Sequence, residues 1–304
     1  MDSRVCALVV TYNRKNLLVE CIHSLQRQTR PIDQIVVVDN KSSDGTPGLL
    51  ATEFPDIPVV ILPENLGGAG GFHAGMKWAY ERGFDWIWIM DDDIETLPNA
   101  LEVMLGYSAI SEFIHVRREG PDGLLALEAI WDTGSCYPIL YGDDPSFKDS
   151  TRDWISFPFG NFEGALIHRN VVSKIGYPDP RFFIAGDDTI YGFLASFHTN
   201  VIYVRTVGII RKLPRPTVRN RMNYYLTIRN RFLMYEHMLR RGVPLTRSMF
   251  RINLIYLLLY LMRDAFGEGL RRSSLSQSIT NTKALLSGLR DGMRGRFGPP
   301  PWLQ

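Results

Sequence analysis

Short, uninterrupted apolar runs alternate with segments of helical apolar spacing along the first 90 residues. The runs have the character of strands that are buried on both faces of a sheet. They are VCALVVTYN (residues 5–13), IVVVDN (35–40), VVIL (59–62) and WIWIM (86–90). Segments that predict helices lie between them, at residues 15–28, 42–54 and 70–83. This alternation is typical of an α/β fold with a mostly parallel central sheet and helices on both faces.

The pattern becomes less regular after residue 106. Residues 117–152 are rich in Gly, Pro and Asp and predict loops or short strands. The further elements that we expect are a strand passing into a short helix (164–176), a helix after an acidic pair (within 179–197) and a short strand (201–204). Helices are expected from about residue 217 onward. We therefore predict an α/β domain over residues 1–216 and a helical region over residues 217–304.

The charge of the chain is unevenly distributed. Of its 304 residues, 45% are apolar and 22% charged, as in a globular protein, and the net charge is +2. Residues 211–296, however, contain 18 Lys and Arg against four Asp and Glu. This asymmetry indicates an acidic body and a basic C-terminal region that meets anionic lipid, a lipid-linked phosphate or nucleic acid. A solvated helical surface is the alternative.

The cysteines and the N-terminus bear on the compartment. Cys6, Cys21 and Cys136 form no CxxC pair, which argues against a metal knuckle and favours a reducing environment. The N-terminus has no secretion signal, so we expect a cytoplasmic protein.

One apolar run stands out in the basic region. INLIYLLLYLM (residues 252–262) is shorter than the roughly 20 residues that span a bilayer. It predicts either a core helix or a helix that lies on an anionic membrane. In the second case, Arg247, Arg251 and Arg263 would reach the lipid headgroups.

Polar side chains follow three of the predicted strands. They are Thr11, Tyr12 and Asn13 after the first, Asp39 and Asn40 after the second, and Asp91, Asp92 and Asp93 after the fourth. Ligands bind at the carboxyl ends of strands in open α/β sheets. The three clusters therefore predict one binding site.

The acidic triplet is a candidate metal site. Side chains i and i+2 of an extended strand point the same way, so Asp91 and Asp93 are expected to converge while Asp92 points elsewhere. Two carboxylates, together with phosphate oxygens and water, are a usual set of ligands for Mg²⁺ or Mn²⁺. The metal would neutralise both the carboxylates and a diphosphate. The alternative is a solvated acidic turn.

Two features nearby suggest a nucleotide ligand. Asp39 can accept a hydrogen bond from a nucleobase or a ribose, or it can cap the helix that follows. ENLGGAGGFHAG (residues 64–75) is neither a GxGxxG fingerprint nor a GxxxxGK[ST] loop. Its glycines predict a close approach of the backbone to a sugar nucleotide, with Asn65 and Gly68 as contacts. His73 is either a substrate contact or a surface or capping residue.

A second acidic pair, Asp187 and Asp188, lies about 95 residues beyond the first cluster. A carboxylate there can act as a general base that takes a proton from an acceptor hydroxyl. Asp188 can equally be the N-cap of the helix that follows.

Several motifs together resemble the inverting family 2 glycosyltransferases, which have the GT-A fold. They are TYNR (residues 11–14), VVVDNKSSDGT (36–46), ENLGGAGGF (64–72), the DDD triplet (91–93) and FFIAGDD (182–188). The glycine stretch, DDDI and GDDTIYG look most like bacterial galactofuranosyltransferases. YYLTIRNRF (224–232) is similar to a segment that follows the catalytic domain there. The resemblance covers about residues 4–235 and makes residues 1–216 the catalytic domain.

The resemblance implies a role for each cluster. The donor nucleotide would be held by Thr11, Tyr12, Asn13, Asp39 and Asp92, beside Asn65 and Gly68. Mn²⁺ or Mg²⁺ would be held by Asp91 and Asp93 and would bind the diphosphate. Asp188 would be the catalytic base, with Asp187 and Glu163 at the acceptor.

Two positions depart from the family pattern. The family usually has a metal-binding His shortly after the strand that follows the base, whereas VIYVRTVGIIRKLP (residues 201–214) has none. Arg211 or a neighbour occupies that place; an arginine does not ligate a cation, but it can contact the diphosphate directly. His198 precedes the strand and is misplaced for the role. Leu194 stands where relatives often carry Arg.

These observations predict a metal-assisted inverting glycosyltransferase. The resemblance implies UDP-galactofuranose as donor and a lipid-linked glycan as acceptor, in the synthesis of a cell-surface polysaccharide. The basic helices would lie on the cytoplasmic face of an anionic membrane, with no nucleic acid involved. A rhamnosyl- or glucosyltransferase on the same scaffold is one alternative. A non-catalytic, membrane-associated protein that binds a sugar nucleotide is the other.

Overall fold

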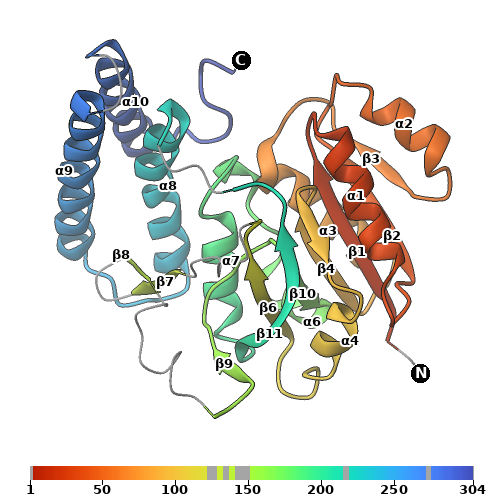
Figure 1. Cartoon of the computed structure of the whole chain (residues 1–304). Helices are drawn as coiled ribbons and strands as arrows, with labels where there is room; N and C mark the ends of the chain where they lie inside the picture. The colour runs from red at the N-terminus through yellow and green to blue at the C-terminus, as the bar shows by residue number, and fades with distance from the viewer. Residues whose placement is uncertain are drawn as a thin grey trace.

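The structure is a computed structural model that describes residues 3–121, 129–132, 137–140, 151–214, 219–271 and 275–303 (Figure 1). Its strands are β1 (Val5–Thr11), β2 (Gln34–Asp39), β3 (Val59–Ile61), β4 (Trp86–Asp91), β5 (Ile94–Thr96), β6 (Phe113–Glu119), β7 (Ala129–Asp132), β8 (Tyr137–Leu140), β9 (Trp154–Ser156), β10 (Ala165–His168) and β11 (Val201–Arg211). Its helices are α1 (Lys15–Gln26), α2 (Thr46–Glu53), α3 (Gly67–Glu81), α4 (Ala100–Leu105), α6 (Arg169–Ile175), the 3-10 helix η2 (Pro180–Phe182), α7 (Asp187–Ala195), α8 (Arg221–Arg240), α9 (Arg247–Arg271) and α10 (Leu275–Met293).

The central sheet is parallel in its first half and mixed in its second. β3, β2, β1 and β4 lie side by side in parallel, as the alternating pattern predicts. Antiparallel β10 then lies between β4 and β6, and β11 pairs in parallel with β6. The short strands β5 and β9 add to β11 in antiparallel orientation. The predicted α/β class is confirmed, with more antiparallel pairing than expected because short strands carry no periodicity that encodes their direction.

Strand β1 shows how one apolar run contributes to two layers. Val5, Ala7 and Val9 belong to the core layer that contains the buried face of α1. Cys6, Leu8 and Val10 belong to the opposite layer, which contains the buried face of α3. Successive side chains of a strand point to opposite faces, so both layers require apolar residues and the run is continuous.

The glycine stretch forms a helix that lies close to the sheet. Helix α3 begins at Gly67, three residues before the predicted start. At Gly71 and Gly75, a Cβ atom would lie 2.4 Å from Val10 Cγ1 and 2.1 Å from Leu8 Cδ1. The helix can approach β1 this closely only without side chains at these positions. Part of the stretch therefore serves helix–sheet packing, which corrects the prediction that its glycines approach a ligand.

The helices α8, α9 and α10 pack together beside the sheet (Figure 1). Helix α8 also shares a core with the α/β part, because Leu233, Met234 and Met238 cluster with Phe182 and Ile190. The predicted boundary between residues 216 and 217 lies outside the described residues, and the division into two domains stays a prediction.

Helix α9 is apolar on two faces. Leu257, Leu261 and Ala265 pack against α8 and α10, as the core-helix prediction requires. The opposite face carries apolar side chains that are between 48% and 64% exposed: Ile252, Ile255, Tyr256, Leu259 and Tyr260. Nowhere in the described part of the chain does a helix combine the length and apolar character needed to cross a bilayer.

Smaller expectations have mixed outcomes. Cys6 and Cys21 are buried and free, whereas Cys136 lies outside the described residues. The strand expected at residues 201–204 continues as β11 to Arg211. Much of residues 117–152 lies outside the described part of the chain.

Candidate active site

An open cleft with two adjoining halves lies at the carboxyl ends of β1 and β4. The first, of about 570 Å³, is lined mainly by Thr11, Tyr12, Arg14, Asn40, Asn65 and Asp92, and we name it the Arg14 half. The second, of about 510 Å³, is lined by Phe72, Phe162, Glu163, Asp187 and Asp188, and we name it the Asp188 half. Gly68, Asp91 and Ile184 line both halves, so the halves meet at these residues.

The side chains of the acidic triplet point in directions that differ from the prediction. Asp91 ends β4, but Asp92 and Asp93 lie in the turn before β5, so the alternation of a strand does not apply to them. Asp92 lines the Arg14 half, where its carboxylate accepts a hydrogen bond from Thr11 Oγ1 at 2.7 Å. Asp93 instead lies 3.7 Å from both Arg14 and Arg211. Asp91 and Asp92 therefore line the cleft, so the expectation that Asp92 points elsewhere is wrong, whereas the convergence of Asp91 and Asp93 stays a prediction.

Arg14 is a cleft residue that was not predicted. Its guanidinium lies 3.1 Å from Asp92 Oδ1, and its side chain is 46% exposed. It gives the Arg14 half a cation that a bound anion can reach. The sequence could have indicated this role, because Arg14 directly follows Thr11, Tyr12 and Asn13 within the TYNR motif.

Two predicted nucleotide contacts hold loops in place instead. Asp39 is fully buried, and its carboxylate accepts a hydrogen bond from Ser42 N–H at 3.1 Å. It therefore caps a turn rather than helix α2, whose N-cap is Gly45. Asn13, with a φ of 53°, accepts a hydrogen bond from Ser43 N–H at 2.7 Å. Neither side chain lines the cleft, because each is engaged by backbone donors of the next loop.

Asn40 and Asn65 shape the start of α3 within the Arg14 half. Asn40 accepts a hydrogen bond from Leu66 N–H at 3.2 Å and donates one to the Gly67 carbonyl at 3.1 Å. Asn65 accepts one from Gly67 N–H at 2.9 Å. At Gly68, an added Cβ would meet nothing nearer than 3.8 Å, so the backbone faces open space there. The predicted approach of a ligand to Gly68 has room.

The acid pair begins helix α7. The N-cap is Gly186, so Asp188 lies in the first turn and not at the cap. Asp188 Oδ1 accepts hydrogen bonds from Thr189 N–H at 2.6 Å and from Thr189 Oγ1 at 3.1 Å. These bonds hold its carboxylate in one orientation at the cleft.

The two acids of the pair differ in how readily they ionise. Burial raises the pKa of Asp187, and the neighbouring charge of Asp188 raises it further. Burial also raises the pKa of Asp188, but the two hydrogen bonds from Thr189 favour its ionised form. Of the two, Asp188 is therefore the better proton acceptor, and Asp187 is the one that retains a proton.

Glu163 adds a third carboxylate to the Asp188 half. It is ion-paired with Arg118, which is 2% exposed, and lies 3.7 Å from Arg211. Arg211, which stands where the family pattern has a His, therefore bridges Glu163 and Asp93. It does not line the cleft, so direct contact with a diphosphate would require it to leave these partners.

Asp91 fits a divalent cation when other ligands are supplied. Burial and the charges of Glu163 and Asp93 raise its pKa well above the ordinary value, and no described side chain pairs with its carboxylate. Within the described ranges, no three His, Cys, Asp or Glu side chains form a group that could hold a metal ion. A cation would therefore need oxygens of a diphosphate and water beside Asp91. Asp93, placed against two arginines, does not fit as the second ligand in this arrangement.

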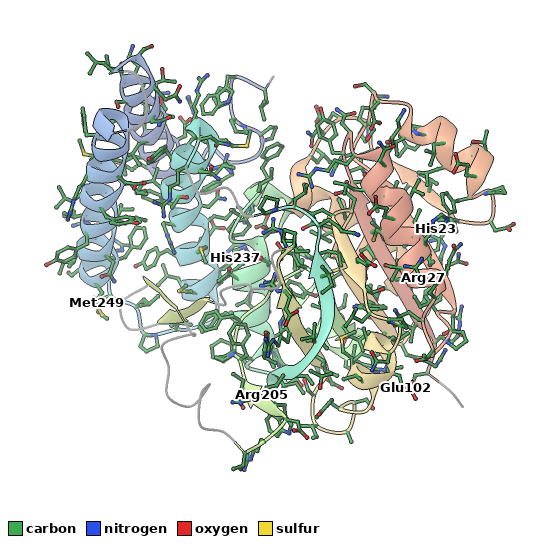
Figure 2. The ribbon with its side chains drawn as sticks, viewed as in Figure 1. His23, Arg27, Glu102, Arg205, His237 and Met249 are labelled. Atoms are coloured by element: carbon green, nitrogen blue, oxygen red, sulfur yellow. The ribbon has the colours of Figure 1, made fainter. Side chains whose placement is uncertain are left out.

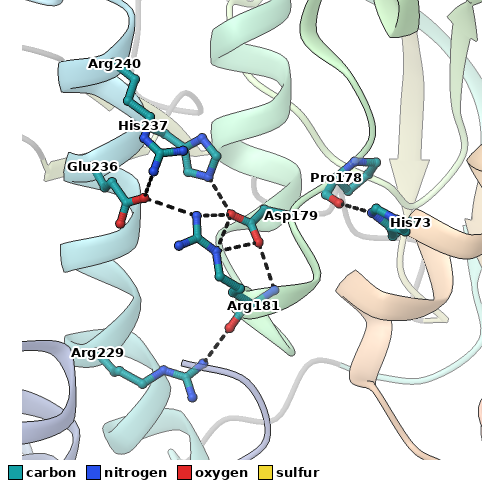
Figure 3. Close-up of polar contacts among 8 residues, drawn as sticks. All are labelled: His73, Pro178, Asp179, Arg181, Arg229, Glu236, His237 and Arg240. Carbon is teal, nitrogen blue, oxygen red and sulfur yellow. Dashed lines mark hydrogen bonds and ion pairs between the residues drawn. The ribbon is translucent and has the colours of Figure 1, made fainter. Parts of the chain in front are cut away.

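The remaining candidates lie away from the cleft. His73 Nδ1 is 2.8 Å from the Pro178 carbonyl (Figure 3). This contact agrees with a structural role for His73 rather than with a substrate contact. His198 follows the far end of α7, 3.5 Å from Arg241 Nη1, which agrees with its exclusion as a metal ligand. Leu194 is buried in the core.

Comparisons with known proteins agree with this geometry. Residues 6–119 match the Glycosyl transferase family 2 model, and this range contains Arg14 and the acidic triplet. Residues 6–119 thus resemble a family 2 glycosyltransferase domain, and the fold agrees with the GT-A fold that the motifs imply.

Particular relatives are galactofuranosyltransferases. The chain is 33% identical over 195 residues to galactofuranosyltransferase GlfT1 of Mycolicibacterium smegmatis, which covers 60% of this chain and 62% of that protein. It is 30% identical over 196 residues to GlfT1 of Mycobacterium tuberculosis, covering 62% and 63%. The chain thus matches less than two thirds of the length of either relative. The resemblance stated from the motifs is confirmed.

Solved structures support the fold. S. aureus TarS aligns with a TM-score of 0.60 at 14% identity over 99% of this chain and 50% of that chain. A mannosyltransferase from Pyrobaculum calidifontis, solved with GDP-Man and Mn²⁺, aligns with a TM-score of 0.55 at 15% identity over 97% and 88%. A shorter form of TarS has been solved with UDP-GlcNAc.

Proposed function

We propose that this chain is an inverting glycosyltransferase that moves galactofuranose from UDP-galactofuranose to a hydroxyl of a lipid-linked glycan, with Mn²⁺ or Mg²⁺. One observation supports this above all: a family 2 domain places a cationic half and a carboxylate half of one cleft against each other at Asp91. The similarity to two galactofuranosyltransferases supports the donor. The sugar-nucleotide complexes of the structural neighbours support a nucleotide-linked sugar.

In the proposed reaction, the Arg14 half binds the nucleotide. Arg14 meets the diphosphate with charge-assisted hydrogen bonds. Tyr12, which is 43% exposed, offers its ring to the base. Gly68 lets the backbone approach the ligand. A divalent cation held by Asp91 and the diphosphate would supply charge that offsets the negative charge of the leaving group.

The Asp188 half binds the acceptor and takes its proton. Asp188 accepts the proton of the acceptor hydroxyl as the hydroxyl oxygen bonds to the anomeric carbon. The bond from that carbon to the diphosphate oxygen breaks on the opposite side, which inverts the configuration. Protonated Asp187 and ionised Glu163 hydrogen-bond other hydroxyls of the acceptor. Phe72 and Phe162 form an apolar wall of this half.

The experiment offers purified protein a synthetic lipid-linked galactoside, Mn²⁺ and a panel of donors. The donors are UDP-galactofuranose, UDP-galactopyranose, UDP-glucose and dTDP-rhamnose. We expect UDP-galactofuranose to be used about tenfold faster than the others or better. Preferential use of UDP-glucose or dTDP-rhamnose would show instead that the protein is a glucosyl- or rhamnosyltransferase on the same scaffold. UDP binding without transfer from any donor would favour a non-catalytic protein.

We extend the proposal to a peripheral contact with the cytoplasmic face of an anionic membrane. The free face of α9 is apolar from Ile252 to Tyr260, and Arg247, Arg251 and Arg263 near it are exposed. An apolar stripe bordered by cations matches the surface of an anionic bilayer. Docking there would bring the cleft to an acceptor carried on a lipid.

Vesicle sedimentation tests this contact. The protein should bind vesicles of phosphatidylglycerol and phosphatidylcholine, and the double change Tyr256→Ser and Leu259→Ser should weaken binding about tenfold or more. Leu286→Ser, at a 47% exposed position on α10, is the matched control and should bind normally. Unchanged binding by the double variant would refute the contact. So would dimers of the wild-type chain that the double change dissociates, because they would show that a second copy covers this face.

A further inference from the structure

The loop between η2 and α7 has an unusual backbone. Phe183, Ala185 and Gly186 have φ angles of 67°, 71° and 93°. For the two residues with side chains this left-handed conformation costs free energy, so surrounding contacts must maintain it. The loop carries Ile184, which lines both halves of the cleft, and it ends where Asp187 begins α7. Its conformation therefore determines where the acid pair lies.

Two adjacent residues of α8 hold this loop by its carbonyl groups. Asn230 Nδ2 donates to the carbonyls of Phe182 at 3.2 Å, Ile184 at 3.0 Å and Ala185 at 2.7 Å. Arg229 Nη2 donates to the Phe182 carbonyl at 2.8 Å. Arg229 is 0% and Asn230 3% exposed, so their donor groups are shielded from water and find their partners in the protein.

Arg229 also fixes the orientation of Asn230. Its Nε and Nη2 atoms donate to Asn230 Oδ1 at 2.9 and 2.8 Å. An arginine only donates, so the oxygen of the amide must face it and the NH₂ group must face the loop. The pair thus acts as one unit.

A second set of contacts joins α8 to the start of the same segment. Asp179 accepts a hydrogen bond from His237 Nε2 at 2.9 Å and pairs with Arg181 at 2.7 Å (Figure 3). Arg181 also lies 3.2 Å from Glu236. His237 lies on the side of α8 that faces the α/β part of the chain (Figure 2). These contacts anchor η2 without Asn230, so a change at Asn230 acts on the loop that follows.

We propose that Arg229 and Asn230 are positioning residues for the reaction. They hold the loop of residues 183–186, with its left-handed backbone at Phe183, Ala185 and Gly186, in the conformation that presents Asp187 and Asp188 to the acceptor. Neither touches the cleft, so they act through the loop backbone. The inference rests on the proposed function, because it assigns the acid pair a part in transfer.

The test compares Asn230→Asp with His237→Gln, two turns along the same helix. Asn230→Asp keeps the size of the side chain and its contact with Arg229, but it replaces the amide donors with a carboxylate that repels the carbonyls. We expect kcat to fall about 100-fold, as for a small misplacement of a catalytic group, with UDP affinity within about twofold of wild type. The acid limb of the pH profile should also shift, because the surroundings of Asp188 change. His237→Gln should lose thermal stability but keep kcat.

Wild-type kcat in folded Asn230→Asp would overturn the proposal, and so would an equal loss of kcat in both variants. If Asn230→Asp does not fold, Arg229→Lys serves instead, since it keeps the charge but loses the paired donors to Asn230. It should lower kcat about tenfold at unchanged UDP affinity, and an unchanged kcat would again overturn the proposal. Amide hydrogen exchange distinguishes failure of the positioning proposal from failure of the proposed function. Faster exchange at residues 183–186 in either variant supports the loop contact even if the wild type transfers no sugar, and unchanged exchange refutes it.

Discussion

The two halves of the cleft are built in opposite ways. The Arg14 half comes from strand ends that are neighbours in the sheet, and its groups pair with one another, Thr11 and Arg14 with Asp92. The Asp188 half is assembled from segments far apart in the sequence. A site for a charged ligand can be formed by adjacent strand ends alone. The Asp188 half instead depends on tertiary packing that brings distant segments together.

The halves also differ in how their charges are balanced. Arg14 is half exposed, so it can exchange Asp92 for an anionic ligand. Glu163 is paired with Arg118 and Arg211, which do not line the cleft. The first half is thus suited to a diphosphate and the second to neutral hydroxyl groups.

Changing Asp91, the acid that lines both halves, should have the largest effect on this comparison. Asp91→Asn should lower transfer about 100- to 1,000-fold, because it removes the group that fits the cation. Calorimetry of UDP binding with Mn²⁺ and with EDTA should show that the metal no longer enhances affinity. Asp93→Asn is the control and should keep the metal effect. If the metal no longer enhances UDP affinity in Asp93→Asn, then Asp93 is a metal ligand together with Asp91, as the strand pattern predicted.

Removing the charge of Arg14 should affect the Arg14 half only. Arg14→Met should weaken UDP binding about 10- to 100-fold, the contribution of a hydrogen bond between charged groups. The salt dependence of binding should fall as well, while kcat changes less than KM for the donor. Lys15→Met, one position further on, should bind UDP normally. Equal losses in both variants would show a general effect of positive charge rather than a contact in the cleft.

The smallest expected effect concerns the buried acid of the Asp188 half. The pKa of Asp187 is raised in the folded protein, so the folded state resists its ionisation. This cost is absent below the ordinary carboxyl pKa of about 4 and grows as the pH rises through the raised value. Asp187→Asn should therefore be more stable than wild type by on the order of 1 kcal/mol at pH 8 and equal to it at pH 4. Thermal unfolding at both pH values measures this, and a variant that is less stable at pH 8 would contradict it.

The sequence predicts the Arg14 half better than the Asp188 half. Continuous apolar runs mark parallel strands, and their polar ends meet at one edge, so Thr11, Tyr12 and Asp91 lie at the cleft as expected. Asp39 has the same kind of position, yet its carboxylate is used by Ser42 N–H. The strand pattern does not show whether a carboxylate at a strand end lines the cleft or accepts a backbone hydrogen bond, because this depends on the conformation of the turn that follows the strand.

The contacts made by α8 were not predicted. Arg229 and Asn230 belong to the YYLTIRNRF segment that resembles a family segment, but the sequence does not name their partners. Their partners lie more than 40 positions earlier, in a loop whose left-handed backbone has no periodicity to reveal it. Such contacts depend on how the helix packs, which local pattern does not encode.

The most direct measurement compares sugar transfer and UDP binding in Asp188→Asn. The central claim is that the Arg14 half binds the donor and the Asp188 half supplies the base. We expect transfer to fall about 1,000-fold, within the range that a general base contributes, while the Kd for UDP with Mn²⁺ stays within about twofold of wild type. Transfer within about tenfold of wild type, or loss of UDP binding together with transfer, would contradict the division of the cleft.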